Sequence, residues 1–182
     1  MPAVLLVAAT ERELCGYDGL ACGIGPVEAA AATARALARG TWEAVLHVGI
    51  AGGRGLAPAS FVIGSEALYC DLAAAIRLVG RVPADERLVA AVAAVLSAAP
   101  VLPIGTSAAV GTVGRDVAVE AMEGFGVLRA AAIAGVPAVE VRAISNEIGE
   151  ADRTRWRFDE AIDALATMLP SLLAAVGSVT RR

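Results

Sequence analysis

The segment 119–149 constrains the fold of this chain more than any other, because it predicts a helix followed directly by a buried strand. Small and apolar residues run through 124–134, and Gly135 and Pro137 then end the helix. The next run, VPAVEVRAIS, is apolar and β-branched, which is typical of a strand buried on both faces. Such a strand needs helices on both sides of its sheet, so the segment indicates an α/β protein.

The rest of the chain shows the same alternation of strand and helix. Buried strands are expected at 3–9, 42–50 and 61–69, with one or two short strands within 101–113. Helices are expected at 26–40, 83–98 and 156–176, the last one kinked or split by Pro170. This order predicts one α/β domain over residues 1–182, with a central, mostly parallel or mixed, twisted sheet flanked by helices.

Composition and spacing argue against several classes of partner. The chain has a net charge of −4 and scattered basic residues, so no nucleic-acid partner is expected. The uncharged stretch between Arg87 and Arg115 contains Pro100 and Pro103, so no membrane span is expected there. The three cysteines lack metal-ligand or disulfide spacing, and the first residues lack a basic n-region. We therefore expect reduced thiols, a cytoplasmic location, and neither metal nor cofactor.

Three polar residues stand at or beside the ends of expected strands: Glu13, Glu123 and Asn146. Ligands of open α/β sheets bind just outside the carboxyl ends of the strands, so these residues are candidates for a binding site. Simpler interpretations stay open, since Glu123 also suits a helix N-terminus and Asn146 also suits a turn. For His47, the only histidine, a packed position in mid-strand is favoured over catalysis.

The order of several short motifs is more specific than any one residue. These motifs are ATERE, GIGPVEAA, VGIAGG, SEALYCD, VEAMEG and VRAISN. Together they resemble the purine nucleoside phosphorylase and hydrolase superfamily, and more narrowly the nucleosidases that cleave methylthioadenosine and S-adenosylhomocysteine. The MEG motif and VRAISNEIGE followed by D-R-x-R-W resemble most closely the futalosine hydrolase family of menaquinone biosynthesis. The resemblance covers nearly the whole chain and implies a nucleoside phosphorylase-like fold.

The resemblance also implies a role for individual residues. Glu13 matches the acid that activates water, and Glu123 matches the acid that accepts hydrogen bonds from the 2′- and 3′-hydroxyls of the ribose. Met122 matches the methionine under the ribose, while Ile50 and Gly52 belong to the glycine-rich turn beside the sugar. N-glycosidic cleavage passes through an oxocarbenium-like sugar, which suits two carboxylates on the sugar side.

The resemblance places Asn146 where the adenine nucleosidases have an aspartate that supports protonation of N7. An amide offers both a donor and an acceptor, so it suits the O6 and N7 edge of a 6-oxopurine better than a carboxylate does. With Ser145 as a neighbouring binding residue, we expect hydrolysis of futalosine, which carries hypoxanthine. Two alternatives stay open: a methylthioadenosine or S-adenosylhomocysteine type of nucleosidase, and a non-catalytic nucleoside-binding relative.

Departures from the family pattern bear on the nucleophile and on assembly. Glu13 would repel phosphate, so water is the expected nucleophile. Arg54 has three open uses: binding phosphate, binding the carboxylate of futalosine's benzoate arm, or solvation in a loop. Only nine residues separate Glu13 from Gly23, where the nucleosidases have a longer segment. Ala121 also lacks the acid of the adenine nucleosidases. A homo-oligomer, in which a neighbouring subunit completes the rim of the site, is therefore expected.

Overall fold

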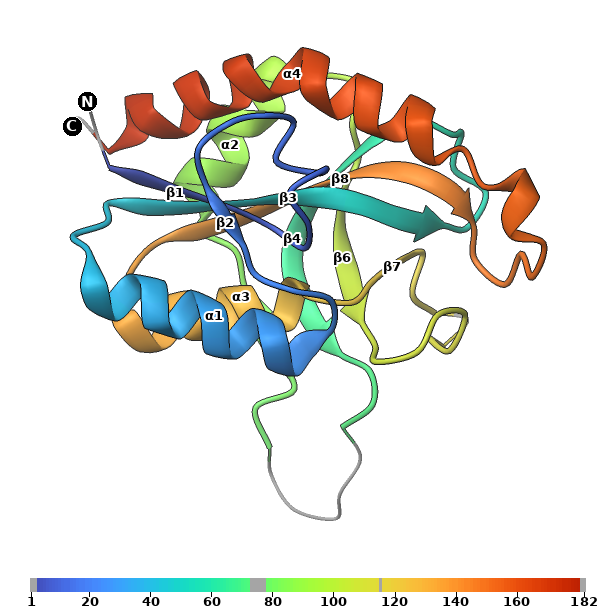
Figure 1. Cartoon of the computed structure of the whole chain (residues 1–182), viewed down its shortest axis with the longest axis horizontal. Helices are drawn as coiled ribbons and strands as arrows, with labels where there is room; N and C mark the ends of the chain where they lie inside the picture. The colour runs from blue at the N-terminus through green and yellow to red at the C-terminus, as the bar shows by residue number, and fades with distance from the viewer. Residues whose placement is uncertain (1–2, 73–77, 115, 181–182) are drawn as a thin grey trace.

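Helices cover both faces of a mixed β-sheet in the computed structural model, which describes residues 3–72, 78–114 and 116–180 (Figure 1). Helices α1 (Pro26–Arg39) and α3 (Gly124–Ala134) pack together on one face. Helices α2 (Glu86–Val95) and α4 (Phe158–Val179) pack together on the other face, and a short 3₁₀ helix, η1 (Arg153–Arg155), precedes α4. The expected α/β class is confirmed.

The sheet of the described residues has eight strands. They are β1 (Val4–Ala8), β2 (Leu20–Ala21), β3 (Ala44–Gly53), β4 (Phe61–Tyr69), β5 (Arg81–Pro83), β6 (Val101–Thr106), β7 (Val119–Ala121) and β8 (Ala138–Glu147). Their order is β2-β1-β3-β7-β6-β4-β5, and β8 pairs with both β3 and β4. Strand β8 runs parallel to β3 and antiparallel to β4, so the sheet is mixed.

Five of these strands pair in a closed ring, β3-β8-β4-β6-β7, with β7 returning to β3. A small closed sheet of this kind is filled by the side chains that point inward. The apolar cluster that fills it consists of Ala51, Val62, Ile104, Val119, Ala121 and Ile144. Because inward and outward residues alternate along a strand, Glu120 of β7 faces away from this cluster.

Most expected elements occur close to their predicted bounds, but strands β2, β5 and β7 were not expected. Each has two or three residues, and its partner strands define it more than its own sequence does. Pro83, expected to open a helix, lies in β5, and α2 begins at Glu86 because the Asp85 side chain accepts from the N–H groups of Arg87 and Leu88. The expected turn after Ile50 is wrong, since β3 continues to Gly53.

Helix α4 continues through Pro170 as one element, so of the two expected effects, a kink or a split, the split is wrong. Pro170 and the residue four positions before it are both exposed, so the carbonyl that loses its helical partner can bond to water. By length and composition alone, the stretch 153–179 is apolar enough to cross a membrane. However, Leu165, Leu169 and Leu172 are fully buried against the sheet, as in a core helix.

Candidate functional site

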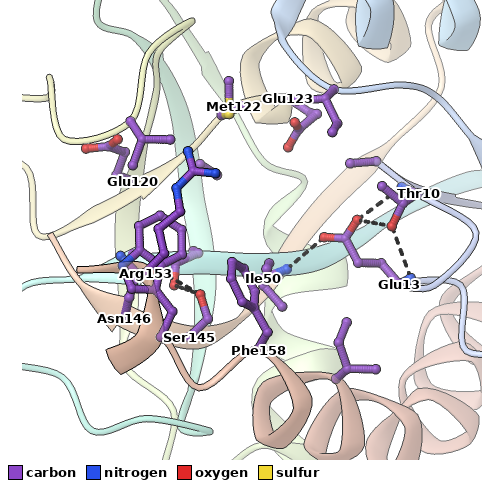
Figure 2. A pocket seen from close by; sticks show the side chains of 18 of the residues that line it. Thr10, Glu13, Ile50, Glu120, Met122, Glu123, Ser145, Asn146, Arg153 and Phe158 are labelled. Carbon is purple, nitrogen blue, oxygen red and sulfur yellow. Dashed lines mark hydrogen bonds between the residues drawn. The ribbon is translucent and has the colours of Figure 1, made fainter. Parts of the chain in front are cut away.

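A cavity of about 310 Å³ opens at the carboxyl ends of β1, β3 and β8 (Figure 2). The seven residues expected at the site all line it: Glu13, Ile50, Gly52, Met122, Glu123, Ser145 and Asn146. Further lining residues, to which the sequence analysis gave no individual role, include Thr10, Glu120, Arg153, Trp156 and Phe158. The lining therefore combines carboxylates, an amide and apolar surface, which suits a small polar ligand with an apolar part.

Glu13 lies in a tight turn directly after β1, where its own N–H donates to the Thr10 carbonyl (3.1 Å). The side chain is only 6% exposed. Its Oε2 accepts from the N–H (3.0 Å) and the hydroxyl (2.8 Å) of Thr10, and Oε1 accepts from the N–H of Ile50 (3.1 Å) (Figure 2). Three donors therefore fix the orientation of a carboxylate at the edge of the cavity.

Glu123 precedes α3 directly and lies at the junction of three segments. Its Oε1 accepts from the N–H of Gly25 (3.1 Å), at the start of α1. Its Oε2 lies 3.4 Å from Nη2 of Arg142, on β8. Each carboxylate oxygen has a second lone pair, so Glu123 can still accept hydrogen bonds from a ligand in the cavity.

A buried charged layer that the sequence analysis missed lies beneath these two acids. Arg142 is fully buried, and its Nε donates to Oε1 of Glu140 (2.7 Å). Its Nη1 donates to the Ile50 carbonyl (3.3 Å). Burial alone would lower the pKa of Arg142, but the surrounding carboxylates, Glu140 first, raise it above its ordinary value. One signal was available, because residues two apart in a strand share a face and E-V-R places opposite charges on it.

His47 belongs to the same layer and is fully buried, as expected for a packed residue. Its Nε2 lies 2.6 Å from Nη2 of Arg142, and its Nδ1 lies 3.1 Å from the Val7 carbonyl. Because a guanidinium can only donate, Nε2 accepts and Nδ1 carries the hydrogen. Burial, together with the charge of Arg142, holds the pKa of His47 well below its ordinary value. The ring is therefore neutral and positions the guanidinium.

Gly49 allows a carboxylate at the cavity and a guanidinium of the charged layer to lie close together. A Cβ added there would lie 2.7 Å from Oε1 of Glu13 and 2.5 Å from Nη1 of Arg142. Both distances are shorter than any real Cβ contact, so a larger residue would push these groups apart. The glycine therefore lets the carboxylate and the guanidinium approach each other across β3.

A β-bulge explains why two consecutive residues of β8 line the cavity. Ala51 pairs with Ile144, but the next residue, Gly52, pairs with Asn146, which leaves Ser145 unpaired. Regular alternation would turn Ser145 and Asn146 to opposite faces, and the extra residue removes that constraint. The Ser145 hydroxyl lies 2.8 Å from Oδ1 of Asn146 and 3.2 Å from the Ala51 carbonyl, so its one hydrogen faces two acceptors, of which Oδ1 is the nearer (Figure 2).

This contact sets the orientation of the Asn146 amide. Oδ1 accepts from Ser145, and Nδ2 donates one hydrogen to the Glu147 carbonyl (3.0 Å). An amide nitrogen carries two hydrogens, so one donor remains for a ligand. Asn146 therefore presents a hydrogen-bond donor at the cavity.

A positively charged side chain lies at the mouth of the cavity, but it is not Arg54, the arginine that the sequence analysis considered for binding. Arg54 does not line the cavity, and its buried Nε has no partner among the described residues. Arg153 of η1 lines the mouth instead, with its guanidinium carbon 5.6 Å from the centre of the Trp156 ring. Trp156 in turn contacts Phe158 at 5.1 Å between ring centroids. The mouth therefore combines aromatic surface with a positive charge.

Comparison with known proteins gives a consistent result. Residues 19–177 match the model of the Phosphorylase superfamily. The futalosine hydrolase of Streptomyces coelicolor is 34% identical, over 90% of this chain and 81% of the relative. That of Acidothermus cellulolyticus is 33% identical, over 92% and 80%.

Solved structures share the fold at lower identity. A methylthioadenosine/S-adenosylhomocysteine nucleosidase from Colwellia psychrerythraea, in complex with adenine, superposes with a TM-score of 0.81 at 22% identity, covering 97% of this chain and 95% of the other. A futalosine hydrolase mutant of Helicobacter pylori superposes with a TM-score of 0.85 at 16% identity, covering 96% and 99%.

Proposed function

The chain belongs to the phosphorylase superfamily, and we propose that it is an N-glycosidase that hydrolyses futalosine to hypoxanthine and dehypoxanthine futalosine. Two relatives at 33% and 34% identity over most of their length are futalosine hydrolases. The observation that carries the proposal is the arrangement of two oriented carboxylates, Glu13 and Glu123, and one donor amide, Asn146, around a single cavity.

On the sugar side, the two carboxylates have different roles. Glu123 accepts hydrogen bonds from the ribose hydroxyls and places negative charge near the developing oxocarbenium ion. Glu13 holds a water beside C1′ and accepts its proton as the water oxygen bonds to C1′. The C1′–N9 bond breaks at the same time, and its electron pair leaves with the base. Glu13 then returns its proton to solvent.

On the base side, the free N–H of Asn146 donates to O6 or N7 of the departing purine. This hydrogen bond stabilises the negative charge that accumulates on the base, which then takes its proton from water. A 6-oxopurine offers acceptors at both positions, whereas a 6-aminopurine presents an amino donor at position 6. The contact with Ser145 holds Oδ1 toward the serine and leaves a hydrogen of Nδ2 free, so the amide is oriented to donate to the base. The geometry thus favours hypoxanthine as the base.

Water is favoured over phosphate as the nucleophile because of the charges at the sugar end of the cavity. Glu13 and Glu123 both place negative charge there, which would repel a phosphate dianion. Arg12 also lines the cavity, but its guanidinium is already paired with Asp159. We therefore propose hydrolysis without phosphate.

The mouth of the cavity suits the benzoate arm of futalosine. Trp156 and Phe158 offer aromatic surface for the ring, and Arg153 offers a positive charge for the carboxylate. Ile24 and Val110 also line the cavity, although they are 62% and 46% exposed. We propose that a second copy of the chain covers these side chains in a homo-oligomer. We also place the enzyme in menaquinone biosynthesis in the cytoplasm.

Chromatography of products tests this function against its alternatives. The wild-type protein should release hypoxanthine from futalosine at the same rate with and without phosphate. Faster release of adenine from methylthioadenosine would favour the methylthioadenosine or S-adenosylhomocysteine type of nucleosidase. An absolute need for phosphate would overturn hydrolysis.

The variant Glu13→Gln tests the proposed base. It should lower kcat about 10²–10⁴-fold, while hypoxanthine binding, measured by calorimetry, is retained. Glu11→Gln serves as the matched control, because Glu11 is exposed and does not line the cavity. If the kcat of Glu13→Gln equalled that of this control, Glu13 would not be the base. If the wild type bound hypoxanthine but released none from any nucleoside, the non-catalytic alternative would hold.

A further inference from the structure

Glu120 is a buried carboxylate in the cavity that the mechanism above does not use. It lies on β7, lines the cavity and is only 5% exposed. Its Oε1 accepts from the N–H of Gly111. Its Oε2 is buried and has no hydrogen-bond partner among the described residues. A buried acceptor without a donor is costly, so this oxygen indicates that a ligand supplies the missing donor.

The register of the sheet places Glu120 opposite Asn146. Gly52 of β3 pairs with Glu120 on one side and with Asn146 on the other. Residues in register share a face of the sheet, and all three line the cavity. Neighbouring strands lie about 4.8 Å apart, so the two polar residues stand on strands about 10 Å apart.

Gly52 keeps the space between these two residues open. A Cβ added there would lie 3.1 Å from Nδ2 of Asn146. With a hydrogen bond of about 2.8 Å on each side, about 4 Å remains for the ligand, which suits the six-membered ring of a purine. The row Glu120–Gly52–Asn146 thus forms a slot with an acceptor at one end and a donor at the other. Figure 2 shows the side chains of Glu120 and Asn146.

We infer that Glu120 determines base specificity by accepting a hydrogen bond from N1–H of a 6-oxopurine held between it and Asn146. The inference rests on the proposed function, which makes the departing base a purine. A 6-oxopurine carries a hydrogen on N1 and, across the C5–C6 bond, an acceptor at N7, and these match the carboxylate and the amide. Adenine also offers N7 to the amide, but it has a lone pair on N1 instead of a hydrogen, so it mismatches the carboxylate of Glu120.

The contact is expected to act on binding more than on the chemical step. N1–H is present both before and after the glycosidic bond breaks, so Glu120 holds substrate and product alike. Its removal should therefore change KM and the affinity for the free base more than kcat. A purely structural role, supporting Gly111, would change stability but not the choice of base.

Glu120→Gln separates these two roles. The amide oxygen of glutamine can still accept from Gly111, while its NH₂ replaces Oε2 and would donate to N1 of adenine. Calorimetry should show hypoxanthine affinity about 10- to 100-fold lower and adenine affinity higher than in wild type. Glu86→Gln, an exposed change on α2, is the control and should leave both unchanged. An unchanged ratio of the two affinities in folded Glu120→Gln would overturn the inference.

A second probe needs no variant. 1-Methylhypoxanthine lacks the N1 hydrogen, so wild-type protein should bind it at least about 10-fold more weakly than hypoxanthine. Equal binding would overturn the inference even if Glu120→Gln did not fold.

Both tests of Glu120 are equilibrium measurements on free bases, so they are independent of turnover. If the base preference depends on Glu120 but futalosine is not hydrolysed, only the proposed function fails. If futalosine is hydrolysed but the preference does not depend on Glu120, only this inference fails.

Discussion

Arg142→Met should destabilise the protein severely, because among the described residues its guanidinium is the one cation that pairs with the buried carboxylates of Glu123 and Glu140. Among the residues that the structure describes, Glu140 would lose its only hydrogen-bond donor, since its Oε2 has no partner there even in the wild type. Burial already raises the pKa of Glu140, and the attraction of Arg142 offsets this only in part. Without Arg142, the carboxyl group must either remain charged and unpaired or take up a proton.

The expected magnitude follows from complete burial. Removing one partner of a buried ion pair costs about 3–5 kcal/mol, out of a total stability of about 5–15 kcal/mol. With a urea m-value of about 2 kcal/mol per M, the unfolding midpoint should fall by about 2 M. The double variant Arg142→Met/Glu140→Met leaves no unpaired charge at Glu140, so it should be more stable than Arg142→Met alone.

Urea titrations of the two single variants and the double variant measure the coupling between Arg142 and Glu140. Arg87→Met is the control, because Arg87 also pairs with a carboxylate, Asp85, but is exposed. It should show no clear shift of the midpoint. A midpoint shift for Arg142→Met no larger than that of this control would contradict a stabilising role of the buried guanidinium. Destabilisation of the double variant by the sum of its single changes would contradict coupling between Arg142 and Glu140. A single variant that does not fold beside a double variant that does would support it.

Two further predictions concern His47 and Arg153. Because the folded pKa of His47 is lowered, its neutral ring stabilises the fold above about pH 6.5, and this contribution is lost as the pH falls toward the folded pKa. Between about pH 5 and 6.5, wild-type stability should therefore fall more steeply than that of His47→Gln, by up to about 1.4 kcal/mol per pH unit in urea titrations. The raised pKa of Glu140 acts in the opposite sense in both proteins, so parallel curves would contradict a neutral His47. Arg153→Gln should raise KM for futalosine about 3- to 10-fold but leave KM for inosine, which lacks the arm, unchanged. Arg155→Gln is the exposed control, and equal effects on both substrates would contradict a role at the arm.

Elements with a clear local pattern could be predicted from the sequence, whereas elements defined by their partners could not. Strand β4 and helix α3 occur at the expected residues, since each has a run of apolar residues and a clear end. Strand β7 has three residues, and its extended form depends on pairing with β3 on one side and β6 on the other. No property of V-E-A alone indicates those partners.

The same distinction holds within the site. The resemblance to known families indicated Glu13, Glu123 and Asn146, and these residues line one cavity. It gave no role to Arg142, although the motif VRAISN contains this residue. Nor did it indicate the bulge at Ser145, because a bulge is a mismatch in length between two strands and is absent from either strand alone. What was missed therefore depends on the register between distant segments.

The buried layer bears on how such a site can accelerate cleavage rather than only bind substrate. The ribose of a nucleoside is nearly neutral, so fixed carboxylates lower the energy of the bound substrate only a little. The oxocarbenium ion is positively charged, so each carboxylate stabilises it more. Glu13 and Glu123 are oriented by backbone N–H groups and by Arg142, so they need not move as the cation forms. Because burial keeps His47 neutral, it adds no positive charge beneath the sugar. The network thus stabilises the transition state more than the substrate, and a change that loosens Arg142 should lower kcat more than it raises KM.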